Sequence, residues 1–399
     1  MIGSGVLSLA WAISQLGWVA GPIALIIFSM ITLFTSTLLS DCYRNSDPIS
    51  GKRNYNYSSA VKSNLGTIQI WICGVCQYVN LCGTAVGYTI TASISVAAIT
   101  KSYCFHKKGH EADCGQDKFC SPSSLTSKTS HGFLSLPPLY PRNTGKTTIT
   151  GTIVGVDVTQ TEKVWNVFQA LGNIAFGYSF SMVLIEIQDT LKSPPAENKV
   201  MKKASIISVD NNRVLHALRL SGLFSLWQHG SREHAHWPFW LIDIANICIV
   251  IHLLGAYQVF CQPVFAVIEK TVIKKWQNIK ILSSEMTLIN ATSFSVTLNI
   301  TRLIWRTVFV VIITSLTIIM PFFIDVMGFL GAFAFCPLTV YFPIEMYISQ
   351  KKIAWSSPKG IMLRILSFLC LLVSLAAAIG SIQGVVVSLC RYKPFHTMS

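Results

Sequence analysis

The chain has 399 residues, of which 51% are hydrophobic and only 12% are charged, and its mean hydropathy is +0.52. Soluble domains usually have about a quarter of their residues charged, so this composition excludes an ordinary soluble protein. The formal net charge of +14 does not predict a nucleic-acid partner, because Lys and Arg collect in loops, where they usually report orientation in a membrane. The sequence predicts an all-α polytopic protein with the lipid bilayer as its environment.

Eight apolar segments are predicted to cross the membrane. The run from Pro22 to Ser40 has no ionisable residue and is long enough to cross a hydrocarbon core of about 30 Å as a helix. Because lipid offers no hydrogen-bond partners, each segment must pair its own backbone amides, and a bundle of helices is expected. The expected spans are residues 2–19, 21–40, 68–99, 166–187, 238–268, 304–324, 326–347 and 361–389.

Basic residues predict the orientation of these spans. The segments 41–67, 188–205, 269–276 and 350–359 are rich in Lys and Arg, which places them in the cytosol by the positive-inside rule. Residues 101–120 then lie outside the cell, where Cys104 and Cys114 could form a disulfide. The Cys/His mixture of this loop fits no common zinc spacing, and no cofactor or metal is predicted.

The segment from Asp210 to Phe239 does not fit this count of crossings. An outward span is required between residues 204 and 237, yet this stretch holds Arg, Glu and His residues. A charge at the centre of a bilayer costs a few kcal/mol. One crossing is therefore missing from the predicted topology.

Ionisable and helix-breaking residues inside spans are candidates for function. Asp243 and His252 share one predicted span, and a His that titrates near neutral pH suits proton coupling. Glu186 and Asp189 close another span at its cytosolic end, where either gating or simple solvation would explain them. Asp325 is expected at a solvated outer boundary.

Several long stretches resemble the plant amino acid permeases, a branch of the amino acid/auxin permease family in the APC superfamily. They include GSGVLSLAWAISQLGWVAGP, FGYSFSMVLIEIQDTLKSPPAENKVMKKA and LTVYFPIEMYISQKKI. The resemblance implies a LeuT-type inverted-repeat helical bundle of eleven spans in the plasma membrane. It also implies transport of amino acids with protons, driven by a proton gradient, and no enzymatic activity.

The resemblance also assigns residues to the substrate site. Gly3, Ser4 and Gly5 match the unwound segment of the family's first span, although two glycines so close together also suit helix packing. Asn173, Phe176 and Tyr178 match its counterpart in the sixth span. His252 and Asp243 are the candidates for proton coupling.

The chain departs from the family pattern in three places, which predicts a truncated and frame-disrupted member. A single transporter domain, 1–399, begins inside its first span; residues 101–150 replace two spans and residues 204–237 replace one. Back-translation of 210–239 in a shifted frame permits an uncharged span. The alternative is a non-transporting or regulatory product that associates with full-length relatives.

Overall fold

The computed structural model describes residues 5–45, 51–108, 152, 154–155, 158–209, 239–275, 285–291, 294–319 and 322–391. The chain divides into two compact units. The first unit is Met1–Asn80, Gly132–Pro238 and Phe322–Ser399, and the second is Leu81–His131 and Phe239–Pro321. Helix α3 (Thr67–Lys108) contributes its beginning to the first unit and the remainder to the second.

The described residues of the first unit are mostly helical, with isolated β-bridges between Arg44 and Arg53 and between Val154 and Val158. A further helix occupies residues 197–209. The named elements are α1 (Gly5–Asp41), α2 (Tyr57–Leu65), α5 (Gln160–Gly177), η1 (Ser181–Val183), α6 (Leu184–Asp189), α10 (Phe323–Ala334), η3 (Phe335–Tyr341), α11 (Phe342–Lys351) and α12 (Pro358–Arg391).

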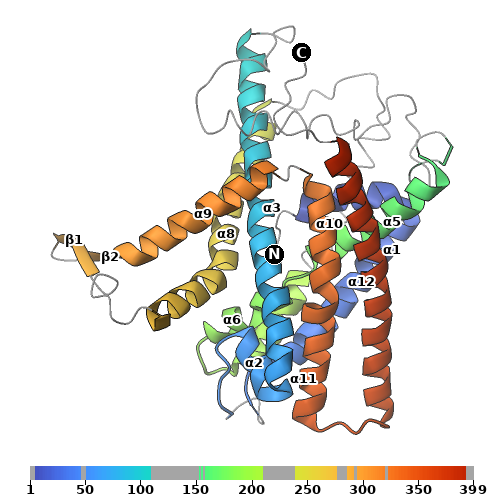
Figure 1. Ribbon diagram of the computed structural model, residues 1–399, viewed down its shortest axis with the longest axis vertical. Helices are drawn as coiled ribbons and strands as arrows, with labels where there is room; N and C mark the ends of the chain where they lie inside the picture. The colour runs from blue at the N-terminus through green and yellow to red at the C-terminus, as the bar shows by residue number, and fades with distance from the viewer. Residues whose placement is uncertain are drawn as a thin grey trace. The chain divides into compact units, whose positions relative to one another are not determined.

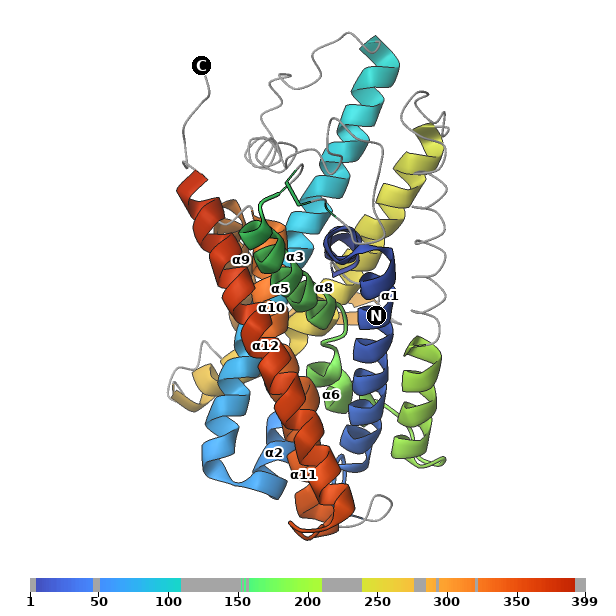
Figure 2. The same ribbon diagram turned by 90° about the vertical axis from the view of Figure 1, so that its right-hand side faces the viewer.

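Helix α5 lies at the centre of this unit. It packs against α1, α10 and α12, and both ribbon views show α10 and α12 running beside each other (Figures 1 and 2). The core is a continuous apolar cluster drawn from α1, α5, η3, α11 and α12. Its members include Ile13, Phe28, Ile174, Tyr178, Phe335, Ile344 and Leu363.

The second unit contains the rest of α3, α8 (Phe239–Lys275), α9 (Ile300–Ile319) and a hairpin of β1 (Glu285–Ala291) and β2 (Phe294–Asn299). Edge-to-face aromatic pairs join its helices: Tyr88 with Phe260, and Phe265 with Phe309. The sequence did not predict the small antiparallel hairpin, but the all-helical character of the spans is confirmed.

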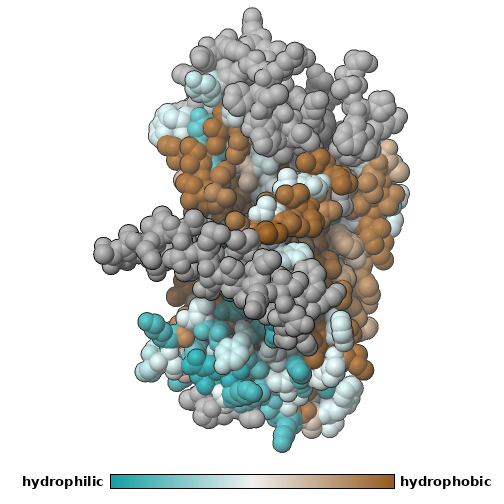
Figure 3. Space-filling model, turned by 60° about the vertical axis from the view of Figure 1, so that its left-hand side comes forward, coloured by the Kyte–Doolittle hydropathy of each residue, from teal (hydrophilic) through white to brown (hydrophobic). Residues whose placement is uncertain are grey.

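Seven helices of the described residues are long and apolar enough to cross a membrane. The eight predicted spans overlap these seven helices, because the first two share α1, although the described residues begin at Gly5 and α9 ends at Ile319, short of the predicted 324. Many large hydrophobic side chains on these helices are exposed, for example Ile365 and Phe368 on α12. Hydrophobic residues cover much of the coloured surface in Figure 3, and hydrophilic residues gather toward the lower end of that view. This distribution suits a protein whose solvent is largely lipid.

The boundary between the first two predicted spans is a break in α1 at Gly17. Its φ of 85° and ψ of 177° are not helical, and the positive φ favours glycine because it has no Cβ. Pro22 follows five residues later inside the second segment, where it removes one backbone N–H donor from the helix.

Candidate functional site

One candidate span, Gln160–Asp189, is divided into α5, η1 and α6. Helix α5 begins with a capping box, in which Thr159 and Glu162 exchange side-chain and backbone hydrogen bonds. It ends at Gly177, and Tyr178 leaves the helical path before η1 and α6 continue the span. A helix interrupted in lipid must pair the backbone groups that the break frees. The N–H groups of Tyr178, Ser179 and Phe180 are paired locally, whereas buried side-chain acceptors at the break are unpaired among the described residues. This break is therefore the candidate site.

The three residues predicted on this span lie at the end of α5. Asn173, Phe176 and Tyr178 are 0%, 8% and 2% exposed. The amide nitrogen of Asn173 donates to the Gln169 carbonyl at 3.1 Å, while its Oδ1 is shielded from solvent and has no hydrogen-bond partner. A buried amide oxygen with unused capacity is an acceptor available to a ligand.

Two buried hydroxyl groups near the break were not predicted from the sequence. Ser181 in η1 and Thr339 in η3 are buried, and neither side-chain oxygen has a hydrogen-bond partner. The two short elements contact each other, and η3 is a π-helix, a geometry that often marks functional sites. In the sequence both hydroxyls look like small packing residues of apolar segments.

The first helix of α1 lies beside the break. A Cβ atom built on Gly177 would lie 3.5 Å from Cδ1 of Leu9, and Gly5, where α1 begins, is about one helical turn before Leu9. Gly3 and Ser4 lie outside the described residues. The structure thus brings the described part of the predicted first-span motif close to α5.

Close packing of α5 on α10 holds the break in place. A Cβ on Gly331 would lie 2.0 Å from the Gly172 carbonyl oxygen and 2.5 Å from the Phe176 amide nitrogen. A Cβ on Gly328 would lie 3.0 Å from Nδ2 of Asn173. Small residues at such positions let membrane helices approach each other through their backbones.

The expectation that Asp325 is a solvated boundary residue is wrong. Its carboxylate accepts hydrogen bonds from Gln169 of α5 and Ser388 of α12. The side chain therefore joins three helices on the far side of Asn173 from the break. Sequence position alone suggested a boundary because Asp325 is in the first turn of α10.

The remaining predicted residues lie in the second unit or outside the described residues. Asp243 and His252 are both on α8; Oδ1 of Asp243 is shielded and lacks a hydrogen-bond partner, and His252 is exposed. Cys114 and the side chain of Cys104 lie outside the described residues. Within the part of the chain that the structure describes, no group of three or more His, Cys, Asp or Glu could hold a metal ion.

Glu186 of α6 faces inward, directly after the break. Its Oε1 accepts hydrogen bonds from the backbone N–H of Tyr57 at 3.2 Å and from Nε2 of Gln77 at 3.3 Å. Gln77 also donates to the Met182 carbonyl at 3.0 Å, and the Tyr57 hydroxyl donates to the carbonyl of Leu338 in η3 at 2.7 Å. The sequence left gating and simple solvation open as explanations of Glu186. These contacts exclude simple solvation of its carboxylate.

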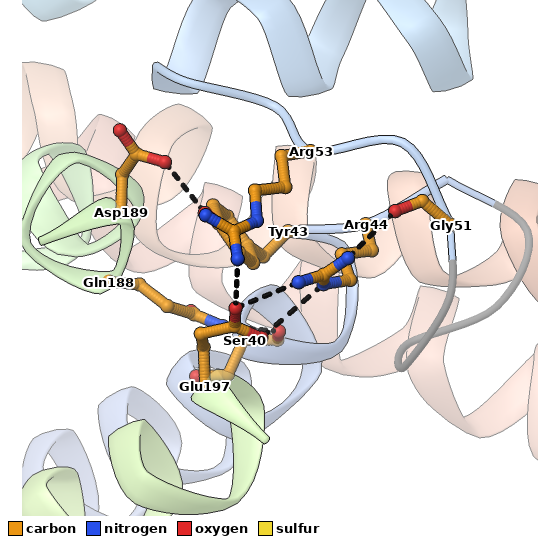
Figure 4. A network of polar contacts seen from close by, with 8 residues as sticks. All are labelled: Ser40, Tyr43, Arg44, Gly51, Arg53, Gln188, Asp189 and Glu197. Atoms are coloured by element: carbon orange, nitrogen blue, oxygen red, sulfur yellow. Dashed lines mark hydrogen bonds and ion pairs between the residues drawn. The ribbon is translucent and has the colours of Figure 1, made fainter. Parts of the chain in front are cut away.

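A network of ion pairs closes the end of this unit that the sequence assigns to the cytosol. The side chain of Glu197 is 1% exposed and lies between Arg44 and Arg53 (Figure 4). Its Oε1 is 2.7 Å from Nη2 of Arg44 and 2.9 Å from Nη2 of Arg53. Asp189 accepts a hydrogen bond from the Tyr43 hydroxyl at 2.6 Å. Gln350 donates to the Arg44 carbonyl at 2.7 Å. Three of the basic segments predicted to share one side of the membrane, 41–67, 188–205 and 350–359, therefore lie together.

The Glu197 carboxylate provides a pH-dependent part of the stability. Burial opposes its ionisation, but hydrogen bonds and the charges of Arg44 and Arg53 outweigh burial and lower its pKa. Because the folded-state pKa is below the unfolded value of about 4.3, the contribution is complete above that value and is lost as the pH falls through the folded pKa. We expect the difference in apparent melting temperature between wild type and Glu197→Gln to be constant near neutrality and to shrink below about pH 4. A difference that shrinks above about pH 6 would contradict this assignment.

A bundle of apolar helices, in which the span of α5, η1 and α6 is broken beside buried polar groups, is the architecture of an integral membrane protein. The family described as "Transmembrane amino acid transporter protein" matches residues 1–122 and 144–387. Amino acid permease 1 of Arabidopsis thaliana is 46% identical over 434 aligned residues, covering 100% of this chain and 89% of the relative. Amino acid permease 8 of the same plant is 45% identical, covering 100% and 91%. The chain belongs to this family of amino acid transporters and is not an enzyme.

These comparisons do not bear out the prediction of a truncated member. The similarity covers the whole chain, and the matched region 144–387 includes the polar block 210–239. The alternative of a non-transporting or regulatory product is not favoured. The family match is interrupted between residues 122 and 144. This interruption lies within the segment 101–150, which was predicted to replace two spans.

Proposed function

We propose that this amino acid transporter moves its substrate together with protons across the plasma membrane. The observation that carries the proposal is the break between α5 and η1, where Asn173 Oδ1 and Ser181 Oγ are buried without hydrogen-bond partners. An amino acid presents an ammonium group, which donates, and a carboxylate, which accepts, and both need polar partners away from water.

The substrate site proposed here combines two segments. Gly3, Ser4 and Gly5 of the first span offer backbone amides to the substrate carboxylate. Asn173 accepts from the ammonium group, while Phe176 and Tyr178 form the wall for the substrate side chain. The name of the relative cited above, an amino acid permease, supports the substrate class.

Replacement of Asn173 by Ala tests the substrate site. Loss of a hydrogen bond to a charged group costs about 1.5–3 kcal/mol, so we expect the KM for amino acid uptake to rise about 10- to 100-fold. Uptake of labelled amino acids would be measured in cells that lack their own permeases. Asn166→Ala is the matched control, because Asn166 lies on the same helix and donates instead to Gln15. An unchanged KM for Asn173→Ala at normal surface expression would remove Asn173 from the site.

We propose that the chain forms one transporter domain, 1–399. Its segments 101–150 and 204–237 depart from the family pattern through altered reading frames. Sequencing full-length transcripts across the codons of both segments tests this proposal. Transcripts with no open alternative frame there would refute it.

A further inference from the structure

The carboxylate of Glu186 has an unusual set of partners. Both of its hydrogen-bond donors, the Tyr57 backbone N–H and the Gln77 amide, are neutral and reach Oε1. Its Oε2 is shielded from solvent and has no hydrogen-bond partner among the residues that the structure describes. Among the described Lys, Arg and His residues, none forms an ion pair with it. Glu197, in contrast, has two guanidinium partners.

The described groups that face Glu186 offer no positive charge. Tyr57 comes from α2, and Cys73 and Tyr78 come from α3. All three are neutral acids, and each could only add negative charge by ionising. Burial raises the pKa of Tyr57 well above its usual value, so its phenol remains a neutral donor to Leu338. A charged carboxylate is unfavourable in these surroundings, and uptake of a proton removes that cost.

We propose that Glu186 is the residue that binds the co-transported proton. The proton forms an O–H bond at Oε2 and makes the side chain neutral, which suits the arrangement described. When water reaches Oε2 from the cytosolic end, that bond breaks, the proton leaves and the carboxylate is restored. Glu186 shares its span with the break after α5, so its charge state is coupled to the segment where the substrate binds.

This inference rests on the proposed proton-coupled transport, and its test separates the two. Wild-type uptake is compared at about pH 5.5 and about pH 7.5; a ratio near one would refute proton coupling itself. In Glu186→Gln, a neutral side chain copies the protonated form and can still accept from Tyr57 and Gln77. We expect its uptake ratio to fall to about one while counterflow of labelled substrate at equal pH stays within about twofold of wild type.

Control variants decide whether Glu186 is the specific group. Asp189→Asn removes a carboxylate from the same helix, one that accepts from Tyr43, and should keep the wild-type ratio. The sequence-level candidates Asp243 and His252 are tested in parallel as Asp243→Asn and His252→Gln. Retention of the wild-type ratio by Glu186→Gln overturns the inference, as does its loss in Asp189→Asn.

A second variant gives a result even if Glu186→Gln does not reach the membrane. Gln77→Met removes one donor to Oε1, which disfavours the charged carboxylate. The midpoint of uptake against pH should then move to higher pH. An unchanged or lowered midpoint, with wild-type uptake still proton-dependent, overturns the inference.

Discussion

Gly331→Ala is expected to abolish transport and to destabilise the folded protein by about 3 kcal/mol. The added Cβ would lie 2.0 Å from the carbonyl oxygen of Gly172 and 2.5 Å from the amide nitrogen of Phe176. Both atoms belong to the backbone of α5, so no side chain can rotate away, and α10 must separate from α5. The separation would displace Phe176, which belongs to the proposed substrate site. The measurements are the apparent melting temperature in detergent and amino acid uptake at matched surface expression.

Gly255→Ala in α8 is the matched control. No heavy atom lies within 4 Å of a Cβ built there, so the substitution meets no steric obstacle. Replacing a glycine inside a helix by alanine typically stabilises by about 0.5–1 kcal/mol. The two Gly→Ala changes should therefore shift the melting temperature in opposite directions. A Gly331→Ala protein that melts and transports like wild type would show that α5 and α10 do not pack as described.

Hydrophobic length was sufficient to predict the spans, because an uncharged run of the right length has few other stable environments. The break between the first two spans was placed a few residues late. Gly17 and Gly21 both occur in that region, and only the backbone conformation shows that the positive φ belongs to Gly17. The packing roles of Gly172 and Gly331 could not be predicted, because each depends on a helix about 150 residues away in the chain.

The candidate site was only partly accessible from the sequence. Resemblance pointed to Asn173, Phe176 and Tyr178, and the structure places all three at the end of one broken span. Glu186 was noticed, but its inward direction depends on Tyr57 and Gln77, which lie 129 and 109 residues away. Ser181 gave no signal, because an isolated Ser in an apolar segment is common at helix-packing positions.

Glu197→Ala is expected to cost about 3–5 kcal/mol of stability, because it leaves Arg44 without its buried partner. The Arg44 side chain is 11% exposed and that of Glu197 is 1% exposed. The pair joins segments 153 residues apart, so its loss should loosen the end of the first unit that contains them. The checks are the apparent melting temperature and the rate of limited proteolysis in the segments 41–56 and 190–205. A melting temperature within one or two degrees of wild type would contradict the buried network.

The partly exposed pair between Lys202 and Asp41 supplies the contrast. Their side chains are 33% and 17% exposed, and such pairs are typically worth no more than about 1 kcal/mol, so Lys202→Ala should change stability little.

A double variant separates the need for a partner from the value of the charges. When a buried pair is replaced by apolar residues of similar size, much of the desolvation cost disappears. Arg44→Met with Glu197→Leu should therefore recover most of the stability that Glu197→Ala loses, since Arg53 is 39% exposed and can turn to solvent. Recovery would mean that the network stabilises the fold mainly by avoiding an unpaired buried charge. A larger loss of stability in the double variant would mean that the charges themselves hold the two segments together.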